Sequence, residues 1–360
     1  MADLSHPQSE PRVPYLNPPW TPENPYPERL TLISHSHGKA SAPQAEIAQN
    51  ANRLIDALAH EGTLIGFSDG SQKDVAGLRR VGLGYSITWK GQEIESSSRG
   101  IGPKADNYDA EMLGIALLAQ KCVAIARERN ICKIHLFSDN QSAVATINSP
   151  KPHAAQYAAL AFRKAAHTFL DESPNRKFTV QWIPGHTRIP GNERADRLAN
   201  EGADSEPTPI YSSTATWLKS RATEVARATW LEAWNTSKRS ANTRRFIPNP
   251  PSFTLNAIFT KDPPPRPITS RLVQLITGHG FYGEFYARMP FLADKDPSCS
   301  CGEPIQTIPH LLFSCPETEA QRSILTKVSM DLNPIALFGS FAGLSAITRF
   351  IIDTRIGRPL

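Results

Sequence analysis

Apolar and polar positions alternate in blocks through the middle of the chain, and these blocks predict a series of strands and helices. The apolar run Thr63–Phe67 ends at Asp69-Gly70, which is typical of a buried strand followed by a turn. Strands at Val81–Trp89 and Gln92–Arg99 are predicted to form a hairpin at Lys90-Gly91. The later pattern predicts a helix at Asn107–Arg129, a strand at Ile131–Phe137, helices at Gln141–Ile147 and Ala154–Leu170, a strand at Phe178–Ile183 and a helix at Gly191–Ala203.

One predicted helix carries an acidic residue on its apolar face. Within Asn107–Arg129, Glu111 heads a stripe that continues through Ile115, Leu118 and Cys122 at helical spacing. A buried carboxylate without a partner is costly in free energy, so we expect a cation to lie against Glu111.

Strands that alternate with helices after an antiparallel start predict an α/β fold in which a mixed sheet is flanked by helices. Asp69 and Asp139 would then follow the carboxyl ends of neighbouring parallel strands, where ligands bind in open α/β sheets. The helices bearing Glu111 and Asp196 can reach the same point. Carboxylates from separate elements supply the oxygen ligands and the negative charge that a hard divalent cation needs. The sequence therefore predicts a metal-dependent nuclease.

The flanking segments differ in composition from this region. Residues 1–30 are rich in proline and predict an extended tail, whereas Ala45–His60 has the apolar spacing of a helix. Trp217–Arg245 is predicted to be a basic helix whose tryptophans 217, 230 and 234 anchor a core rather than stack on bases. The predicted organisation is a proline-rich tail and helix at 1–62, a catalytic domain at 63–205, a basic helical and proline-rich connector at 206–270, a candidate zinc knuckle at 271–322 and a helical tail at 323–360.

Composition limits the class of protein. The chain has 360 residues, a formal net charge of +5 and five cysteines. Basic residues outnumber acidic ones after Trp217, as expected if that part holds a nucleic-acid backbone, although ordinary surfaces show similar surpluses. An odd number of cysteines does not suit a secreted disulfide framework, and Cys122 and Cys132 are expected to be buried thiols. Without a signal-peptide core or a long apolar run, we expect an intracellular protein, nuclear or cytoplasmic, and no membrane partner.

Three cysteines and a histidine are grouped late in the chain. Cys299, Cys301, His310 and Cys315 are residue types that bind Zn²⁺ tetrahedrally. The single-residue gap between the first two cysteines is tighter than in most structural zinc sites. The alternative is three incidental thiols in a small apolar module.

Together, these residues resemble the ribonuclease H family, type 1, specifically the domain embedded in reverse-transcriptase polyproteins of non-LTR retrotransposons. The most specific motifs are Gln181–His186 and Gly191–Asp196, and the spaced Asp69, Glu111 and Asp139 complete the pattern. The resemblance covers about Thr63 to Ala203. The Cys/His group resembles the CCHC-like knuckle near the C-termini of such polyproteins, and Asn17-Pro18-Pro19-Trp20 resembles the stretch after their polymerase. The chain is therefore expected to be a detached 3′ portion of a retroelement.

The resemblance implies a five-stranded mixed sheet and cleavage of the RNA strand in RNA–DNA hybrids, leaving a 5′-phosphate. Its metal ligands map onto Asp69, Glu111, Asp139 and Asp196, with two Mg²⁺ ions, for which Mn²⁺ is a possible substitute. Asp69 is expected to bridge both ions. The resemblance also implies that His186 assists proton movement or product departure. Ser71, Asn107 and Gln141 are the expected contacts to the nucleic acid.

Two positions depart from the family pattern. Arg188 stands where relatives commonly have glycine, which implies a changed backbone angle. Only one helix fits between Ile147 and Phe178, so the basic protruding handle of some bacterial relatives is expected to be missing. The basic segment after Trp217 would then grip the substrate.

Two other functions fit the same residues less well. One is a catalytically lapsed, nucleic-acid-binding retroelement remnant, against which the intact acids argue. The other is a DNA transposase or integrase on the same fold. His135 is expected to be structural. The neighbouring acids Asp106, Asp109, Glu193 and Glu201 are expected to be caps or surface charges.

Overall fold

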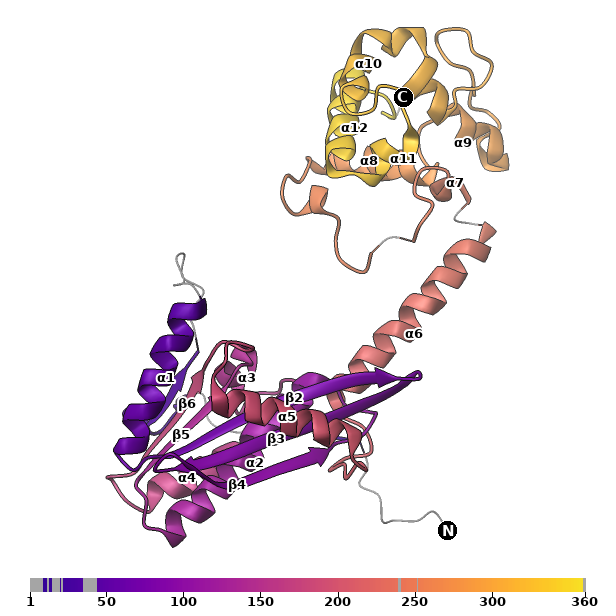
Figure 1. The fold of residues 1–360 in the computed structure, drawn as a ribbon. Helices are drawn as coiled ribbons and strands as arrows, with labels where there is room; N and C mark the ends of the chain where they lie inside the picture. The colour runs from indigo at the N-terminus through magenta and orange to yellow at the C-terminus, as the bar shows by residue number, and fades with distance from the viewer. Residues whose placement is uncertain are drawn as a thin grey trace, which may run out of the picture. The chain divides into compact units, whose positions relative to one another are not determined.

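A computed structural model shows two compact units, Met1–Thr223 and Glu224–Leu360. It describes residues 9–11, 13–14, 20, 22–34, 44–238, 241–250 and 252–358. The division falls within one helix, α6 (Ala215–Thr236). Figure 1 shows the helices and strands of both units.

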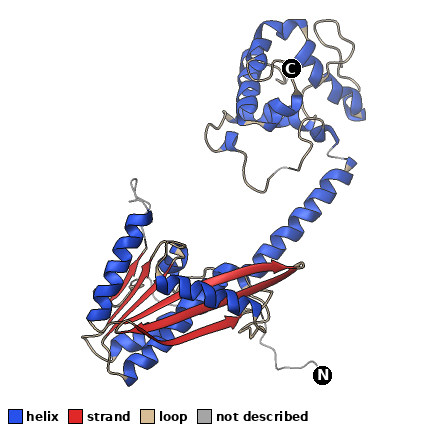
Figure 2. Cartoon of the chain, viewed as in Figure 1, coloured by secondary structure: helices blue, strands red, loops and turns tan. Residues whose placement is uncertain are grey.

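The N-terminal unit is built on a six-stranded sheet with the order β1-β6-β5-β2-β3-β4 (Figure 2). Strands β2, β3 and β4, at one end of the sheet, pair antiparallel, whereas β2, β5, β6 and β1 pair parallel. The mixed α/β fold is therefore confirmed, and β1 adds a sixth strand to the five that were expected. The strands are β1 (Leu30–Ile33), β2 (Leu64–Val75), β3 (Leu78–Trp89), β4 (Gln92–Gly100), β5 (Lys133–Ser138) and β6 (Lys177–Trp182).

Helices cover both faces of this sheet (Figure 1). On one face, α2 and α4 enclose the main core with Leu83 of β3 and Phe178 of β6. On the other, α1 and the start of α5 pack around Phe67 and Phe137. The helices are α1 (Gln44–His60), α2 (Asn107–Glu128), α3 (Gln141–Thr146), α4 (Gln156–Asp171) and α5 (Pro190–Asp204). Because α4 is the one helix between Ile147 and Phe178, a stretch described throughout, the expected absence of a second helix is confirmed.

The predicted turn at Asp69-Gly70 is wrong, because β2 continues to Val75. Its antiparallel pairing with β3 runs on past Asp69↔Gly84, and this pairing keeps the backbone extended. Parallel pairing with β5, however, stops at Ser68↔Ser138. Asp69 and Asp139 therefore still lie at the end of the parallel part of the sheet, where the sequence placed them.

The N-terminal segment is packed rather than a free tail wherever the structure describes it. β1 pairs with β6, and the Arg29 guanidinium donates hydrogen bonds to the carbonyls of Leu170 and Ser173. Glu10 is buried and accepts a hydrogen bond from the backbone N–H of Ala215 at the start of α6. The tail prediction is thus wrong for these residues. Most of the stretch Asn17–Trp20 lies outside the described residues.

The C-terminal unit is a small helical domain with its own apolar core, which includes Leu272, Leu312 and Phe350. Its last helix lies in the predicted helical tail and buries Ile347, Phe350 and Ile351. Its helices are α7 (Ala241–Arg244), α8 (Arg266–Thr277), α9 (Gly283–Arg288), α10 (Glu319–Thr326), α11 (Pro334–Gly339) and α12 (Phe341–Thr354), with 3-10 turns at Ala257–Phe259, Pro290–Leu292 and Pro316–Thr318 and a π-helix at His310–Ser314.

Some expectations about individual side chains are wrong. The tryptophans of α6 do not anchor a core, since no residue of this fully described helix is buried. Trp230 instead stacks on Trp234 and contacts Phe253. Cys122 is buried as expected, but Cys132 is exposed because it precedes β5. Among the described residues, no helix has both the length and the apolar character needed to cross a membrane.

Candidate active site

Three acidic side chains from three separate elements meet at one end of the parallel strands. Asp69 lies on β2, Glu111 on α2, and Asp139 directly after β5; each offers a carboxylate oxygen within 4.8 Å of the other two. Strand register brings Asp69 and Asp139 side by side, because the last parallel pair is Ser68↔Ser138. Oxygen donors grouped in this way suit a divalent metal ion.

Glu111 reaches the cluster because α2 begins close to β2. A capping box formed by Asp106 and Asp109 fixes the start of the helix. A side-chain carbon at Gly70 would lie 2.9 Å from the backbone nitrogen of Glu111, so only glycine permits this approach. The Glu111 carboxylate accepts a hydrogen bond from the Asn107 amide at 3.4 Å, while its other oxygen, Oε2, is buried without a hydrogen-bond partner among the described residues.

Burial and mutual repulsion make it costly for the three carboxylates to be charged together. Burial and the charges of Asp139 and Asp196 raise the pKa of Asp69 to about 7. Burial and the charges of Asp69 and Asp139 hold the pKa of Glu111 well above its ordinary value. The pKa of Asp139 is also raised by burial, although a hydrogen bond from Asn192 and the nearby His186 act against the rise. A cation among them would remove this penalty.

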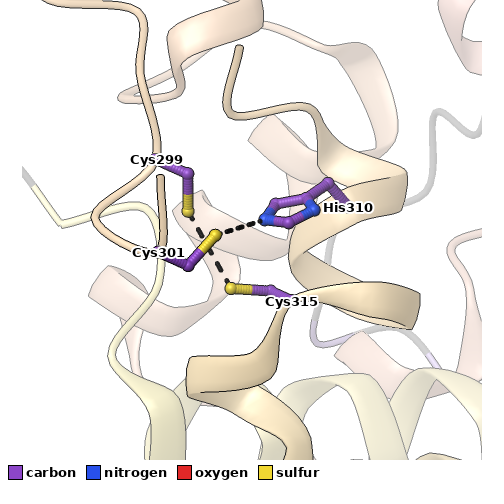
Figure 3. Close-up of side chains that lie close together, drawn as sticks. All are labelled: Cys299, Cys301, His310 and Cys315. Carbon is purple, nitrogen blue, oxygen red and sulfur yellow. Dashed lines mark hydrogen bonds between the residues drawn. The ribbon is translucent and has the colours of Figure 1, made fainter. Parts of the chain in front are cut away.

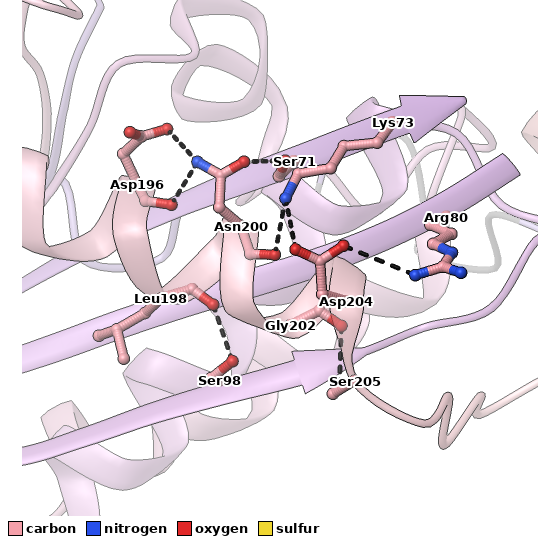
Figure 4. Close-up of polar contacts among 10 residues, drawn as sticks. All are labelled: Ser71, Lys73, Arg80, Ser98, Asp196, Leu198, Asn200, Gly202, Asp204 and Ser205. Carbon is pink, nitrogen blue, oxygen red and sulfur yellow. Dashed lines mark hydrogen bonds and ion pairs between the residues drawn. The ribbon is translucent and has the colours of Figure 1, made fainter. Parts of the chain in front are cut away.

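Asp196, the fourth predicted ligand, lies beside the cluster rather than in its tight group. Its charge is close enough to raise the pKa of both Asp69 and Asp139. Its Oδ1 accepts a hydrogen bond of 3.1 Å from the Asn200 amide one turn later on α5 (Figure 4). The structure thus brings three of the four predicted acids together and places the fourth within electrostatic reach.

His186 lies on the loop between β6 and α5, next to Asp139. Gly185 packs so closely that a side-chain carbon there would lie 2.5 Å from Asp139 Oδ2. His186 itself has φ 52°, and Arg188 has φ 61°. Both residues therefore hold the left-handed conformation that glycine adopts most readily. Because Arg188 stands where relatives commonly have glycine, the loop that carries His186 contains an arginine with a strained backbone conformation.

Two of the three predicted substrate contacts are linked to the carboxylates by hydrogen bonds. The Ser71 hydroxyl donates to Asn200 Oδ1 at 2.9 Å, and Asn107 contacts Glu111. Gln141 is the first residue of α3, directly after the N-cap Asn140. Asn107 is thus bonded to one predicted metal ligand, Ser71 is linked to another through Asn200, and Gln141 follows Asp139 by two residues.

Two polar residues that position Asp139 were not singled out from the sequence. Asn192 is buried and donates to Asp139 Oδ2 at 3.1 Å, and the Trp182 indole donates to the backbone carbonyl of Asp139 at 2.9 Å. Trp182 lies in the motif Gln181–His186 and Asn192 in the motif Gly191–Asp196. Their place in these motifs was the sequence signal that could have identified them. His135 hydrogen-bonds Gln181 and stacks on Phe137, in agreement with its expected structural role.

One acid that was expected to be only a cap does more. Asp109 is fully buried, and besides closing the capping box of α2 it accepts hydrogen bonds from the hydroxyls of Thr214 and Thr216 at 2.6 and 3.0 Å. The helix that carries Glu111 is thereby tied to the start of α6.

The cysteine and histidine group of the C-terminal unit also converges (Figure 3). One ligand atom each from Cys299, Cys301, His310 and Cys315 lies within 4.8 Å of the others. The Cys299 and Cys315 sulfurs are 3.9 Å apart, and the Cys301 sulfur is 3.2 Å from His310 Nε2. Tetrahedral ligands of zinc are separated by about 3.8 Å for two sulfurs and about 3.5 Å for sulfur and nitrogen. The group therefore has the dimensions of a zinc site, and its three cysteines are free rather than joined in a disulfide.

Comparison with known proteins covers the N-terminal unit. A family model described as RNase H matches residues 50–204. A ribonuclease H of Pseudomonas putida strain W619 is 34% identical over 145 residues, which are 38% of this chain and 91% of the relative. A ribonuclease H of Pseudomonas aeruginosa strain LESB58 is 32% identical over 148 residues, covering 39% of this chain and 93% of the relative.

Solved structures give matches over a similar part of the chain. Ribonuclease H1 from the halophilic archaeon Halobacterium salinarum is 22% identical with a TM-score of 0.29, covering 40% of this chain and 98% of that one. The metagenomic LC11 ribonuclease H1 in complex with an RNA/DNA hybrid is 24% identical with a TM-score of 0.31, covering 39% and 97%.

Proposed function

This chain belongs to the ribonuclease H family, and from that premise we infer that it hydrolyses the RNA strand of RNA–DNA hybrids with the help of Mg²⁺. The observation that carries the proposal is the convergence of Asp69, Glu111 and Asp139 from three separate elements. Structural acids are normally paired with a cation or a donor, whereas these three lie together, and the charge of Asp139 raises the pKa of both Asp69 and Glu111.

The donor set fits divalent magnesium. All the donors are carboxylate oxygens, and Glu111 Oε2 is buried without a partner among the described residues. Asp69, Glu111, Asp139 and Asp196 would hold two Mg²⁺ ions, with Mn²⁺ as a substitute. Bound there, the ions would supply Lewis-acid stabilisation of the charge that develops on the phosphate oxygens.

The residues of the chain then orient the substrate and move a proton. A water oxygen attacks phosphorus, the bond to the ribose 3′ oxygen breaks, and the products carry a 5′-phosphate and a 3′-hydroxyl. His186 would carry a proton on a ring nitrogen during this step or help the product to leave, because an imidazole nitrogen can both accept and donate a proton. Asn192 and Trp182 hold Asp139 in place from its side chain and its backbone.

Ser71 can contribute to the choice of RNA. An amide oxygen only accepts hydrogen bonds, so the Ser71 hydroxyl must donate to Asn200 Oδ1. The Ser71 oxygen can therefore only accept a hydrogen bond from a substrate. The 2′-hydroxyl of ribose can donate this hydrogen bond, whereas deoxyribose has no hydroxyl at that position. Asn107 and Gln141 would also contact the nucleic acid.

The proposal is tested with the full chain, Mg²⁺ and a hybrid whose RNA strand is labelled. The expected result is RNA fragments with 5′-phosphates, no cleavage of single-stranded DNA, and loss of more than about 100-fold in rate for Asp69→Asn. Asp74→Asn, an exposed acid on the same strand β2, is the matched control and should cleave normally. Equal cleavage by the Asp69 variant would contradict the mechanism. A wild-type chain that binds the hybrid without cleaving it would favour the lapsed retroelement remnant.

We also propose a retroelement origin for the chain. Its support is the resemblance of the two motifs to the ribonuclease H domain of non-LTR retrotransposons, followed in the same chain by a Cys/His group. The intracellular site of action, nuclear or cytoplasmic, stays a prediction from the sequence.

We further propose that Cys299, Cys301, His310 and Cys315 bind one Zn²⁺ ion that stabilises the C-terminal unit. The ligand separations support this proposal, as does the burial of Cys299 and Cys315 in an otherwise apolar core. Hydrogen bonds that involve Cys301 and His310 outweigh burial and lower the pKa of Cys299 to about 7, which favours a thiolate ligand.

Metal analysis of the purified full chain tests the zinc site. One zinc per chain is expected, and Cys315→Ser should lose it, whereas the exposed Cys132→Ser should retain it. A wild-type chain without zinc would favour three incidental thiols.

A further inference from the structure

A single amide on α5 connects the fourth carboxylate to the strand that carries Asp69 (Figure 4). Asn200 Nδ2 donates to both the backbone carbonyl and the Oδ1 of Asp196, at 2.9 and 3.1 Å. Asn200 Oδ1 accepts from the Ser71 hydroxyl on β2 at 2.9 Å. Every polar atom of the Asn200 side chain is therefore engaged, and the amide is held from both ends.

The surrounding packing keeps these groups at a fixed separation. Helix α5 lies directly on β3, where side-chain carbons at Gly82 and Gly84 would come within 2.0 and 2.2 Å of its backbone. Lys73, two residues beyond Ser71 on β2, donates to the Asn200 carbonyl at 3.1 Å and pairs with Asp204 (Figure 4). The close packing of α5 on the sheet therefore fixes the position of the Asn200 amide.

Asp196 needs such support more than the other three acids. Burial between elements fixes Asp69 and Glu111, and Asn192 and Trp182 hold Asp139. Asp196 is only half-buried and lies outside the tight group. The hydrogen bond from Asn200 fixes its Oδ1 and leaves its Oδ2 available to a cation.

We propose that Asn200 is a positioning residue that holds Asp196 ready to bind metal, with the Ser71 hydroxyl as its anchor on β2. This rests on the proposed function, because Asp196 is a ligand only if the carboxylates bind metal. Groups that orient metal ligands commonly change metal affinity or activity by about 10- to 100-fold when they are removed. Asn200 touches neither metal nor substrate and acts through Asp196.

Calorimetric titration of the full chain with Mg²⁺, without nucleic acid, tests this proposal. Asn200→Ala should weaken Mg²⁺ binding by about tenfold. The Mg²⁺ concentration for half-maximal hybrid cleavage should rise by a similar factor. Glu201→Ala, at the exposed neighbouring position, should bind Mg²⁺ like the wild type. Thermal denaturation checks that each variant is folded.

A double-mutant cycle shows whether Asn200 acts through Asp196. In an Asp196→Asn background, Asn200→Ala should weaken Mg²⁺ binding no further. Unchanged Mg²⁺ binding by Asn200→Ala, or losses that simply add, would overturn the proposal. If Asn200→Ala does not fold, Mg²⁺ binding is measured for Ser71→Ala instead. Mg²⁺ binding weaker by about threefold would support the Ser71 hydroxyl as the anchor of Asn200, and unchanged Mg²⁺ binding would overturn the proposal.

The two proposals fail in different ways. A wild-type chain that binds Mg²⁺ with the expected dependence on Asn200 but cleaves no hybrid would overturn only the proposed function. A chain that cleaves hybrids normally while Asn200→Ala binds Mg²⁺ like the wild type would overturn only the positioning role.

Discussion

At the scale of single residues, Asp69 shows how the fold changes the chemistry of an ordinary side chain. It is buried, and Asp139 and Asp196 lie close enough to oppose its ionisation, so its pKa rises to about 7. Near neutral pH a proton and a metal ion therefore compete for the same carboxylate. Mg²⁺ affinity should accordingly rise as the pH passes through about 7, since the deprotonated carboxylate is the ligand.

The same pKa predicts an unusual stability profile for the metal-free protein. The folded-state pKa of Asp69, about 7, lies above the ordinary aspartate value of 3.8. Its contribution to stability is therefore present below about pH 4 and lost as the pH rises through about 7. Asp69→Asn should raise the free energy of unfolding of the N-terminal unit at pH 8 by on the order of 2 kcal/mol, and change it little at pH 4.

Urea denaturation in magnesium-free buffer at pH 4 and pH 8 measures this difference. Asp74→Asn, which replaces an exposed acid, serves as the control at both pH values. Saturating Mg²⁺ should reverse the order at pH 8, because it stabilises only the chain that retains Asp69. If the free energy of unfolding of the wild type rises between pH 4 and 8 in parallel with that of Asp69→Asn, the predicted stability profile is contradicted.

At the scale of secondary-structure elements, the active site depends on how closely α5 and α2 approach the sheet. The sequence pattern predicted each of these elements and the strand ends that carry Asp69 and Asp139, because local periodicity determines both. It did not predict that β2 continues past Gly70, since Asp69-Gly70 has the local signature of a turn. Pairing with β3 and contact with α2 decide the outcome there. Nor can local sequence show that Asp109 contacts Thr214, more than a hundred residues later.

The approach of α5 to β3 gives a prediction at this scale. In Gly84→Ala, the added carbon would lie 2.2 Å from the Ala199 nitrogen and 2.5 Å from the Ala195 carbonyl oxygen, both in the backbone of α5. The helix must then move, and Asp196 with it. We expect a loss of about 3 kcal/mol or more in the free energy of unfolding, together with weaker Mg²⁺ binding by whatever protein still folds.

Gly114→Ala is the matched control for this substitution. Gly114 lies within α2, and its added carbon would meet nothing closer than the Ser68 side chain at 3.5 Å. Because alanine favours helix, this variant should be as stable as the wild type or more stable by about 0.5–1 kcal/mol. Chemical denaturation of both variants provides the comparison, and equal stability of the two would contradict the role given to the α5–β3 contact.

At the scale of the whole molecule, the N-terminal unit extends beyond the region that the motifs identify. β1 lengthens the sheet, and Glu10 accepts a hydrogen bond at the start of α6. Residues 206–216 belong to it as well, because Thr208 bonds to Gly100, and Thr214 and Thr216 bond to the buried Asp109. The predicted boundary after residue 205 would cut through these contacts. They could not be foreseen, since each joins segments that are distant in the sequence and carry no pattern of their own.

The division into two units predicts what the C-terminal part contributes. A chain that ends at Thr223 keeps every contact of Asp109 and all the carboxylates, so it should fold and cleave hybrids with an unchanged kcat. If the basic C-terminal part grips the nucleic-acid backbone, the shortened chain should have a KM for the hybrid raised by about tenfold, and a weaker dependence of binding on salt. A chain that ends at residue 205 should instead be unstable, because Asp109 would remain buried without the two threonine hydroxyls. Steady-state kinetics and hybrid binding at two salt concentrations measure these effects. An unchanged KM and salt dependence for the chain ending at Thr223 would rule out a role for the C-terminal part in holding the substrate.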